Sequence, residues 1–114
     1  MPERQIAAEV TREQVFLQLR DEIPYASTVE TEQWEDKPDG SARIEQVIYV
    51  QRPSQRAIVL GEGGQRIKAI GARARAELER MLERRVHLFL FVKVREDWVE
   101  DRERYAALRL DYDA

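Results

Sequence analysis

The sequence contains no cysteine, a single histidine and no long apolar run. The missing cysteine excludes disulfides and thiolate metal ligands, and it is compatible with a reducing compartment. The single histidine, His87, is too little for a zinc site, so we interpret it as packed or exposed rather than catalytic. The longest apolar run, 86–92, is far shorter than the roughly 20 residues that cross a bilayer. No signal peptide opens the chain, so we expect neither a membrane span nor secretion.

The residue patterns of nucleotide-binding and catalytic sites are also missing. A P-loop needs a Lys-Ser or Lys-Thr pair after its glycines, and the chain has neither pair. The dinucleotide fingerprint fits Gly61 and Gly63 but fails at Arg66, where a third glycine is required. Glu30 and Glu32 suggest a carboxylate pair, although a solvated strand edge explains them better. Because no nucleophile with a base and an orienting group is recognisable, we expect this chain not to be an enzyme.

The composition is that of one globular domain with an uneven charge distribution. The 114 residues are 43% hydrophobic and 36% charged, with a formal net charge of −3. Residues 56–95 hold 10 basic and 4 acidic side chains, whereas the segments on either side are acidic. Local potential steers an anionic ligand more than net charge does. The basic middle of the chain is therefore the region where we expect an anionic partner to bind.

The spacing of apolar residues predicts a single α+β domain with the order helix, strand, strand, helix, helix, strand. The expected ranges are 12–22, 27–35, 43–51, 55–60, a helix of roughly five turns from Ile67 to Leu82, and 86–95. We take Thr11 and Ser54 as N-caps and Pro24 as the end of the first helix. The first two strands form an antiparallel hairpin around the turn at 36–40.

The last strand alternates clearly, with leucines and valines on one face and His87, Phe89 and Phe91 on the other. The two phenylalanines could stack nucleic-acid bases. Packing under a further helix over 98–109, anchored by Trp98, is the interpretation that we favour from the sequence. That helix and the acidic residues around it would complete the chain.

Three glycines within four residues form the most informative stretch of the chain. Gly61-Glu62-Gly63-Gly64 fits a G-x-x-G loop, and glycine permits positive φ angles and close backbone approach. A helix that begins after such a turn directs free N–H groups and its positive dipole end outward. A loop of this kind clamps about four nucleotides of single-stranded nucleic acid. The simpler interpretation is a plain connector between two helices.

The candidate RNA-binding residues are this loop and its flanks. They are Ile58, Val59, Leu60, Gly61, Glu62, Gly63, Gly64, Gln65, Arg66, Ile67 and Lys68. Ile58, Val59 and Ile67 are the apolar groove candidates, and Arg66 and Lys68 are the phosphate candidates. Arg80, Arg84 and Arg85 are better explained as a solvated face.

This order of elements resembles the type II (prokaryotic) KH fold, a three-stranded sheet covered on one face by helices. Several blocks look like the C-terminal RNA-binding domain of the bacterial GTPase Era family, in family order. They are 19–26, 67–71, Ala74-Arg75, 86–94 and Trp98, and the resemblance spans about residues 11–110. Glu62 departs from the family pattern, because that loop often carries a basic residue. Arg109 also stands where the family has a glycine.

The resemblance implies a domain organisation and a function. Residues 1–10 would be a polar linker from a missing N-terminal GTPase domain, 11–97 the KH domain, and 98–114 a C-terminal helix with an acidic tail. The domain would bind single-stranded RNA at the 3′ end of 16S ribosomal RNA during assembly of the small ribosomal subunit. GTP and Mg²⁺ would belong to the missing domain, so no cofactor is expected here.

The same resemblance implies a cytoplasmic protein, with peripheral association of the full-length protein at the inner membrane, and a monomer. Two alternatives stay open from the residues alone. The fold could serve as a protein-interaction module in which Glu62 has made the loop indifferent to RNA. The chain could also be a stand-alone KH RNA-binding protein.

Overall fold

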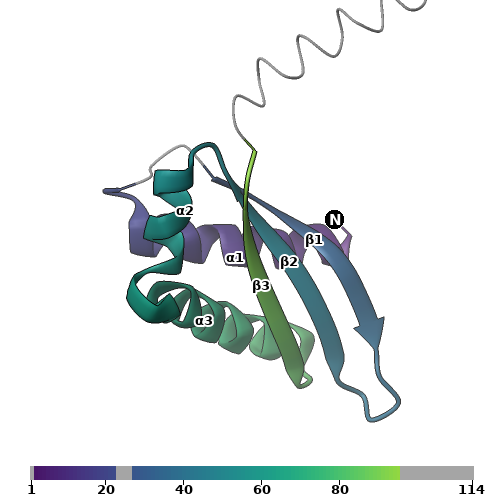
Figure 1. Ribbon diagram of the computed structural model, residues 1–114. Coiled ribbons are helices and arrows are strands. Elements are labelled where there is room, and N and C mark those ends of the chain that lie inside the picture. The colour runs from purple at the N-terminus through teal and green to yellow at the C-terminus, as the bar shows by residue number, and fades with distance from the viewer. Residues whose placement is uncertain (1, 23–26, 96–114) are drawn as a thin grey trace, which may run out of the picture.

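The computed structural model describes residues 2–22 and 27–95. Its elements, in chain order, are α1 (Glu3–Leu19), β1 (Ser27–Asp36), β2 (Ala42–Val50), α2 (Pro53–Leu60), the short 3₁₀ helix η1 (Glu62–Gly64), α3 (Gln65–Leu82) and β3 (Val86–Val94). The predicted order of helices and strands is confirmed (Figure 1). Pro24 and the expected helix over 98–109 lie outside the described residues.

The three strands form one mixed sheet in the order β1-β2-β3. β1 pairs with β2 antiparallel, as the hairpin prediction requires, and β2 pairs with β3 parallel. The three α-helices pack on one face of this sheet (Figure 1), which confirms the α+β prediction. β2 is nearly buried throughout because it lies between two strands, whereas β3 is an edge strand that α2 and α3 flank.

The core lies between the helices and the inner face of the sheet, in two clusters. One cluster packs the second half of α1 against Ile48, Val59 and Ile70. The other packs the first half of α1 against Ile44 and Leu78. Each fully buried aliphatic side chain contributes about 1.5–3 kcal/mol to stability. This packing fixes α3 against the sheet and thereby the position of the glycine loop at its N-terminus.

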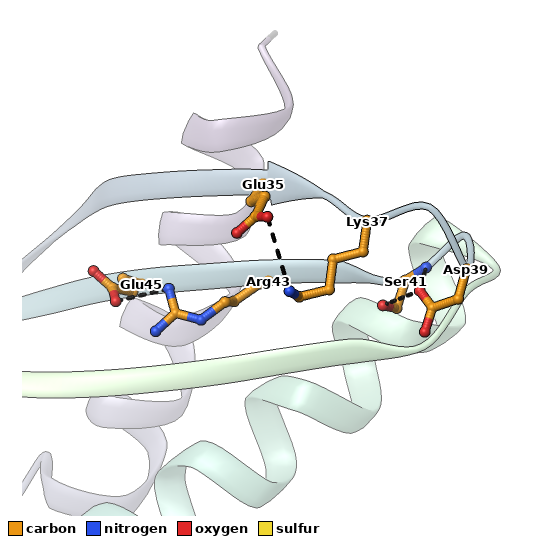
Figure 2. Close-up of polar contacts among 6 residues, drawn as sticks. All are labelled: Glu35, Lys37, Asp39, Ser41, Arg43 and Glu45. Atoms are coloured by element: carbon orange, nitrogen blue, oxygen red, sulfur yellow. Dashed lines mark hydrogen bonds and ion pairs between the residues drawn. The ribbon is translucent and has the colours of Figure 1, made fainter.

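The free end of the β1–β2 hairpin is held by polar contacts on the face turned away from the helices (Figure 2). Asp39 accepts hydrogen bonds from the N–H and the hydroxyl of Ser41, at 2.9 and 2.6 Å. Arg43 pairs with Glu45 at 2.8 Å along the same strand. The turn between the strands needs the positive φ of 89° at Gly40, as its sequence predicts.

Helix α1 begins earlier than its capping signals predict. It starts at Glu3, so residues 3–10 are its first turns rather than a polar lead-in, and Ala7 and Val10 are buried. Thr11 is not an N-cap but a fully buried residue within the helix. The apolar residues before Thr11 continue the helical face of those after it, and their burial extends the helix.

Helix α2 also begins earlier than expected. Ser54 does not cap it; Arg52 occupies the N-cap position and Pro53 the first helical position. Proline is favoured at this position because its missing N–H would have no partner there and its φ already suits a helix. The Gln55 side chain accepts hydrogen bonds from the N–H groups of Gln51 and Arg52, both at 3.0 Å.

Candidate nucleic-acid interface

The G-x-x-G loop connects α2 to α3 with a backbone that three glycines make possible. Gly61, Gly63 and Gly64 all have positive φ angles, of 72°, 62° and 76°. A Cβ at Gly61 would lie 2.7 Å from the Cβ of Arg66 and 2.8 Å from its backbone nitrogen. Gly63 and Gly64 face open space. The first glycine therefore serves the packing of the turn, and the other two provide its left-handed conformation.

Two backbone donors of this loop have no hydrogen-bond partner among the described residues. The N–H groups of Gly61 and Gly64 donate to Ala57 and Gly61 at 2.9 and 3.1 Å, and that of Gln65 donates to Glu62. Within the described part of the chain, the N–H groups of Glu62 and Gly63 make no hydrogen bond. Both residues are exposed. Free N–H groups beside a helix N-terminus are suited to a phosphate oxygen.

A hollow of about 430 Å³ lies between α3 and the edge strand β3. Its α3 wall is formed by Ile67, Lys68, Gly71, Ala72 and Arg75, and its β3 wall by 88–91. Gly71 keeps the hollow deep, because a Cβ there would contact Leu90 at 3.5 Å. Ile67 and Lys68 connect this groove directly to the loop. A chain whose phosphate passes Glu62 and Gly63 could therefore continue along an apolar floor.

The charges of this groove distinguish it from a second hollow on the helical side. None of the described residues that line the α3–β3 groove is a carboxylate, and Lys68 and Arg75 supply positive charge. The second hollow, between α1 and α3, is lined by three glutamates, Glu9, Glu13 and Glu77, and by one cation, Arg12, which pairs with Glu9, so that its charge is negative on balance. A polyanion is attracted to the first surface and repelled by the second.

The structure refines the predicted site residues. Val59 is fully buried and belongs to the core, so its side chain cannot contact a ligand, contrary to the groove role considered from the sequence. Ile58, Leu60 and Ile67 are partly exposed and pack against the core edge. Exposed positions are taken by Glu62, Gly63, Gln65, Arg66 and Lys68.

Sequence reasoning considered Phe89 and Phe91 for base stacking but missed Arg75, Leu88 and Leu90 as lining residues of the groove. Arg75 lies about three helical turns beyond the loop, and Leu88 and Leu90 come from β3, the next element of the chain. The spacing of Lys68 and Arg75 places both on one helix face, and this signal could have identified Arg75. Nothing in the sequence pattern assigns β3 to the edge of the sheet beside α3.

The described residues hold no group of three or more His, Asp or Glu side chains that could bind a metal ion. None of the described helices is both long enough and apolar enough to span a membrane.

Comparison with known proteins gives relatives over almost the whole chain. The chain is 62% identical to GTPase Era of Brucella suis biovar 1 (strain 1330) over 112 residues, which are 98% of this chain and 36% of that protein. It is 61% identical to GTPase Era of Rhizobium meliloti (strain 1021) over the same share of both chains. The chain thus spans about a third of the length of the curated relatives that it matches.

Solved structures agree with this result. Aquifex aeolicus Era bound to GDP·AlF₄⁻ superposes with a TM-score of 0.81 at 39% identity, covering 86% of this chain and 33% of that one. Era in complex with MgGDPNP and nucleotides 1506–1542 of 16S ribosomal RNA gives the same values. The KH domain family model matches residues 22–99. The chain therefore belongs to the KH domain family and corresponds to the KH domain of GTPase Era.

Proposed function

We propose that this domain binds single-stranded RNA, with a phosphate held at the G-x-x-G loop and the adjoining nucleotides in the α3–β3 groove. The observation that carries the proposal is the pair of free N–H groups at Glu62 and Gly63, placed at the mouth of a groove without carboxylates. Lys68 and Arg75 supply the cations that a polynucleotide backbone attracts. Partly exposed Ile67 and Leu90 offer apolar surface to the bases.

The proposed target is the 3′ end of 16S ribosomal RNA. A solved Era structure contains nucleotides 1506–1542 of that RNA, and this chain is 39% identical to it over the matched region. The single acidic residue of the loop, Glu62, lowers the local attraction for phosphate. It does not block the site, because its own N–H is one of the two free donors.

The test uses the double variant Glu62→Asp/Gly63→Asp. Its affinity for an oligoribonucleotide from the 3′ end of 16S ribosomal RNA is measured by fluorescence anisotropy and compared with that of the wild type. The added carboxylate repels the phosphate, and a Cβ at Gly63 crowds the backbone donors, so we expect binding about tenfold weaker or worse, equivalent to roughly 1.4 kcal/mol. The logarithm of the wild-type affinity should fall linearly with the logarithm of salt concentration.

Gly40→Asp is the matched control, because Gly40 also has a positive φ and open space around it but lies in the β1–β2 turn. It should leave RNA affinity unchanged. Equal affinities for the wild type and the loop variant would refute the assignment of the loop. No binding by the wild type even at low salt would refute RNA binding itself.

The role of the full-length protein is inferred from the relatives and is a proposal. The full-length protein would join this domain to a GTPase domain that binds GTP and Mg²⁺ and would act in assembly of the small ribosomal subunit. A cytoplasmic monomer with peripheral association at the inner membrane stays a prediction. Light scattering and sedimentation with inner-membrane vesicles test these two points.

A second candidate function, a protein-interaction module, is favoured by a different surface. Phe16, Leu17 and Met81 expose between 44 and 51% of their surface on the helical side. Phe16 and Met81 line the α1–α3 hollow together with its three glutamates. Such an apolar and acidic surface suits a basic amphipathic segment of a protein rather than RNA.

A further inference from the structure

The outer face of the sheet carries two exposed phenylalanines on its edge strand. Phe89 and Phe91 point away from the helices and expose 43 and 49% of their surface. Their neighbours across β2 are Glu45 and Val47. An edge strand facing water usually carries polar side chains at such positions. Two adjacent exposed rings therefore indicate a surface that another group covers.

This pair of rings, which we call the aromatic strip, is continuous with the α3–β3 groove. The same hollow is lined by Leu88 and Leu90 from one face of β3 and by Phe89 and Phe91 from the other. The groove therefore reaches the edge of the sheet, where the side chains of β3 alternate between its two faces. A chain lying along Lys68 and Arg75 could continue over this edge to the outer face.

Two cations, Arg43 and Lys93, and one carboxylate, Glu45, lie on the same face as the strip. The Arg43 guanidinium lies 4.5 Å from the centre of the Phe89 ring, where its ion pair with Glu45 holds it. Figure 2 shows Arg43 and Glu45 on the face turned away from the helices. Lys93 is exposed on the same face as Phe91. Within the described residues no cation lies over Phe91, and this side chain is 49% exposed.

We propose that the aromatic strip is a stacking platform for RNA bases that follow the nucleotides held at the loop. The proposal rests on the proposed function, since the strip is reached through the same groove. Aromatic rings with interleaved cations bind single-stranded nucleic acid by stacking, which tolerates any base sequence. The strip extends the site beyond the four nucleotides of the loop and makes affinity depend on the length of the RNA.

The experiment compares the affinities of a tetranucleotide and an octanucleotide RNA. Each RNA carries the fluorescent base 2-aminopurine near its 5′ end in one version and near its 3′ end in the other. Wild-type protein should bind the octamer about 5- to 100-fold more tightly than the tetramer, and the distal 2-aminopurine should be quenched by stacking. The Phe89→Ala/Phe91→Ala variant should lose most of this gain and the distal quenching. Phe91→Leu, which keeps apolar volume without a ring, should lose the quenching as well.

Phe16→Ala is the matched control, because Phe16 is 47% exposed but lies on the helical side. It should keep both the tighter binding of the octamer and the quenching of the distal 2-aminopurine. If the affinity of the Phe89→Ala/Phe91→Ala variant depends on RNA length as in the wild type, the stacking role of the strip is refuted. The proposed function still stands in that case if the loop variant binds both oligonucleotides more weakly. Wild-type protein that binds neither length would instead overturn the proposed function.

One competing occupant is the chain's own segment 96–114. A truncated protein that ends at residue 95 distinguishes it from RNA. If length-dependent binding arises only after truncation, that segment and not RNA occupies the strip, and the proposal fails. Equal length dependence in the intact and truncated proteins supports it.

Discussion

At the scale of single residues, the three loop glycines have different physical roles. Gly61 adopts φ 72° and ψ 173°, a region that is essentially restricted to glycine, and its missing Cβ leaves room for Arg66. Gly63 is left-handed at φ 62° and ψ 19°, which asparagine and aspartate tolerate better than other residues. The first position is thus fixed by packing, and the second is open to substitution without a clash.

Gly61→Ala should therefore destabilise the protein more than Gly63→Ala. The first change adds steric overlap to an unfavourable backbone region, and we expect a loss of about 2–4 kcal/mol. The second carries only the left-handed penalty of about 1–2 kcal/mol. Urea denaturation followed by circular dichroism measures both losses. Equal losses would contradict the close approach of Arg66 to Gly61.

At the scale of elements, the β1–β2 hairpin ends in hydrogen bonds that favour ionised carboxylates. The hydrogen bonds from Ser41 lower the pKa of Asp39 below its ordinary value. The hydrogen bond from Trp34, followed by the contact with Arg84, lowers the pKa of Asp36. Arg84 also lies 2.9 Å from Asp36 and ties the segment before β3 to β1. The ordered end of the hairpin therefore depends on charge.

The sign of the resulting pH dependence follows from the lowered pKa values. Their stabilisation is complete above the unfolded aspartate pKa of about 3.9 and is lost as pH falls through the lower folded pKa values. We expect Asp39→Asn to flatten the decline of the unfolding free energy below about pH 4. Ser41→Ala should flatten it too, because it removes one of the two donors. A decline as steep in both variants as in the wild type would exclude this contribution of Asp39.

At the scale of the whole molecule, one buried polar contact joins the helical layer to the sheet. Thr11 on α1 donates a hydrogen bond to the side-chain oxygen of Gln46 on β2, and both residues are fully buried. The Gln46 amide donates to Thr31 at 3.3 Å on β1. This chain of contacts lies between the two apolar clusters. It fixes the position of α1 along the sheet, because a shift would leave buried polar groups without partners.

Gln46→Ala should cost about 2–4 kcal/mol of unfolding free energy, because it leaves a cavity and removes the acceptor of the buried Thr11 hydroxyl. The matched variant Thr11→Val/Gln46→Leu removes both polar partners and should cost much less. Urea denaturation of the two variants measures the difference. A double variant as unstable as Gln46→Ala would show that shape, and not the unpaired hydroxyl, sets the cost.

The sequence by itself determined the type and order of the elements and the position of the loop. Alternation in 86–94 and the spacing of apolar residues after Ile67 are local patterns, and each follows from the geometry of a single strand or helix. The three glycines within four residues likewise require a left-handed turn wherever the chain folds. The start of α1 differed most from the expected bounds, since burial of Ala7 and Val10 outweighed the capping signal at Thr11.

Only the tertiary structure decided which surface lies beside the loop. The groove exists because β3 lies at the edge of the sheet beside α3, which brings Leu90 to Gly71 across some 20 residues of chain. The same packing buried Val59, left the N–H groups of Glu62 and Gly63 free, and placed Phe89 and Phe91 at the rim of the groove. Contacts between residues distant in the sequence leave no local pattern, so these features had to be found in the fold.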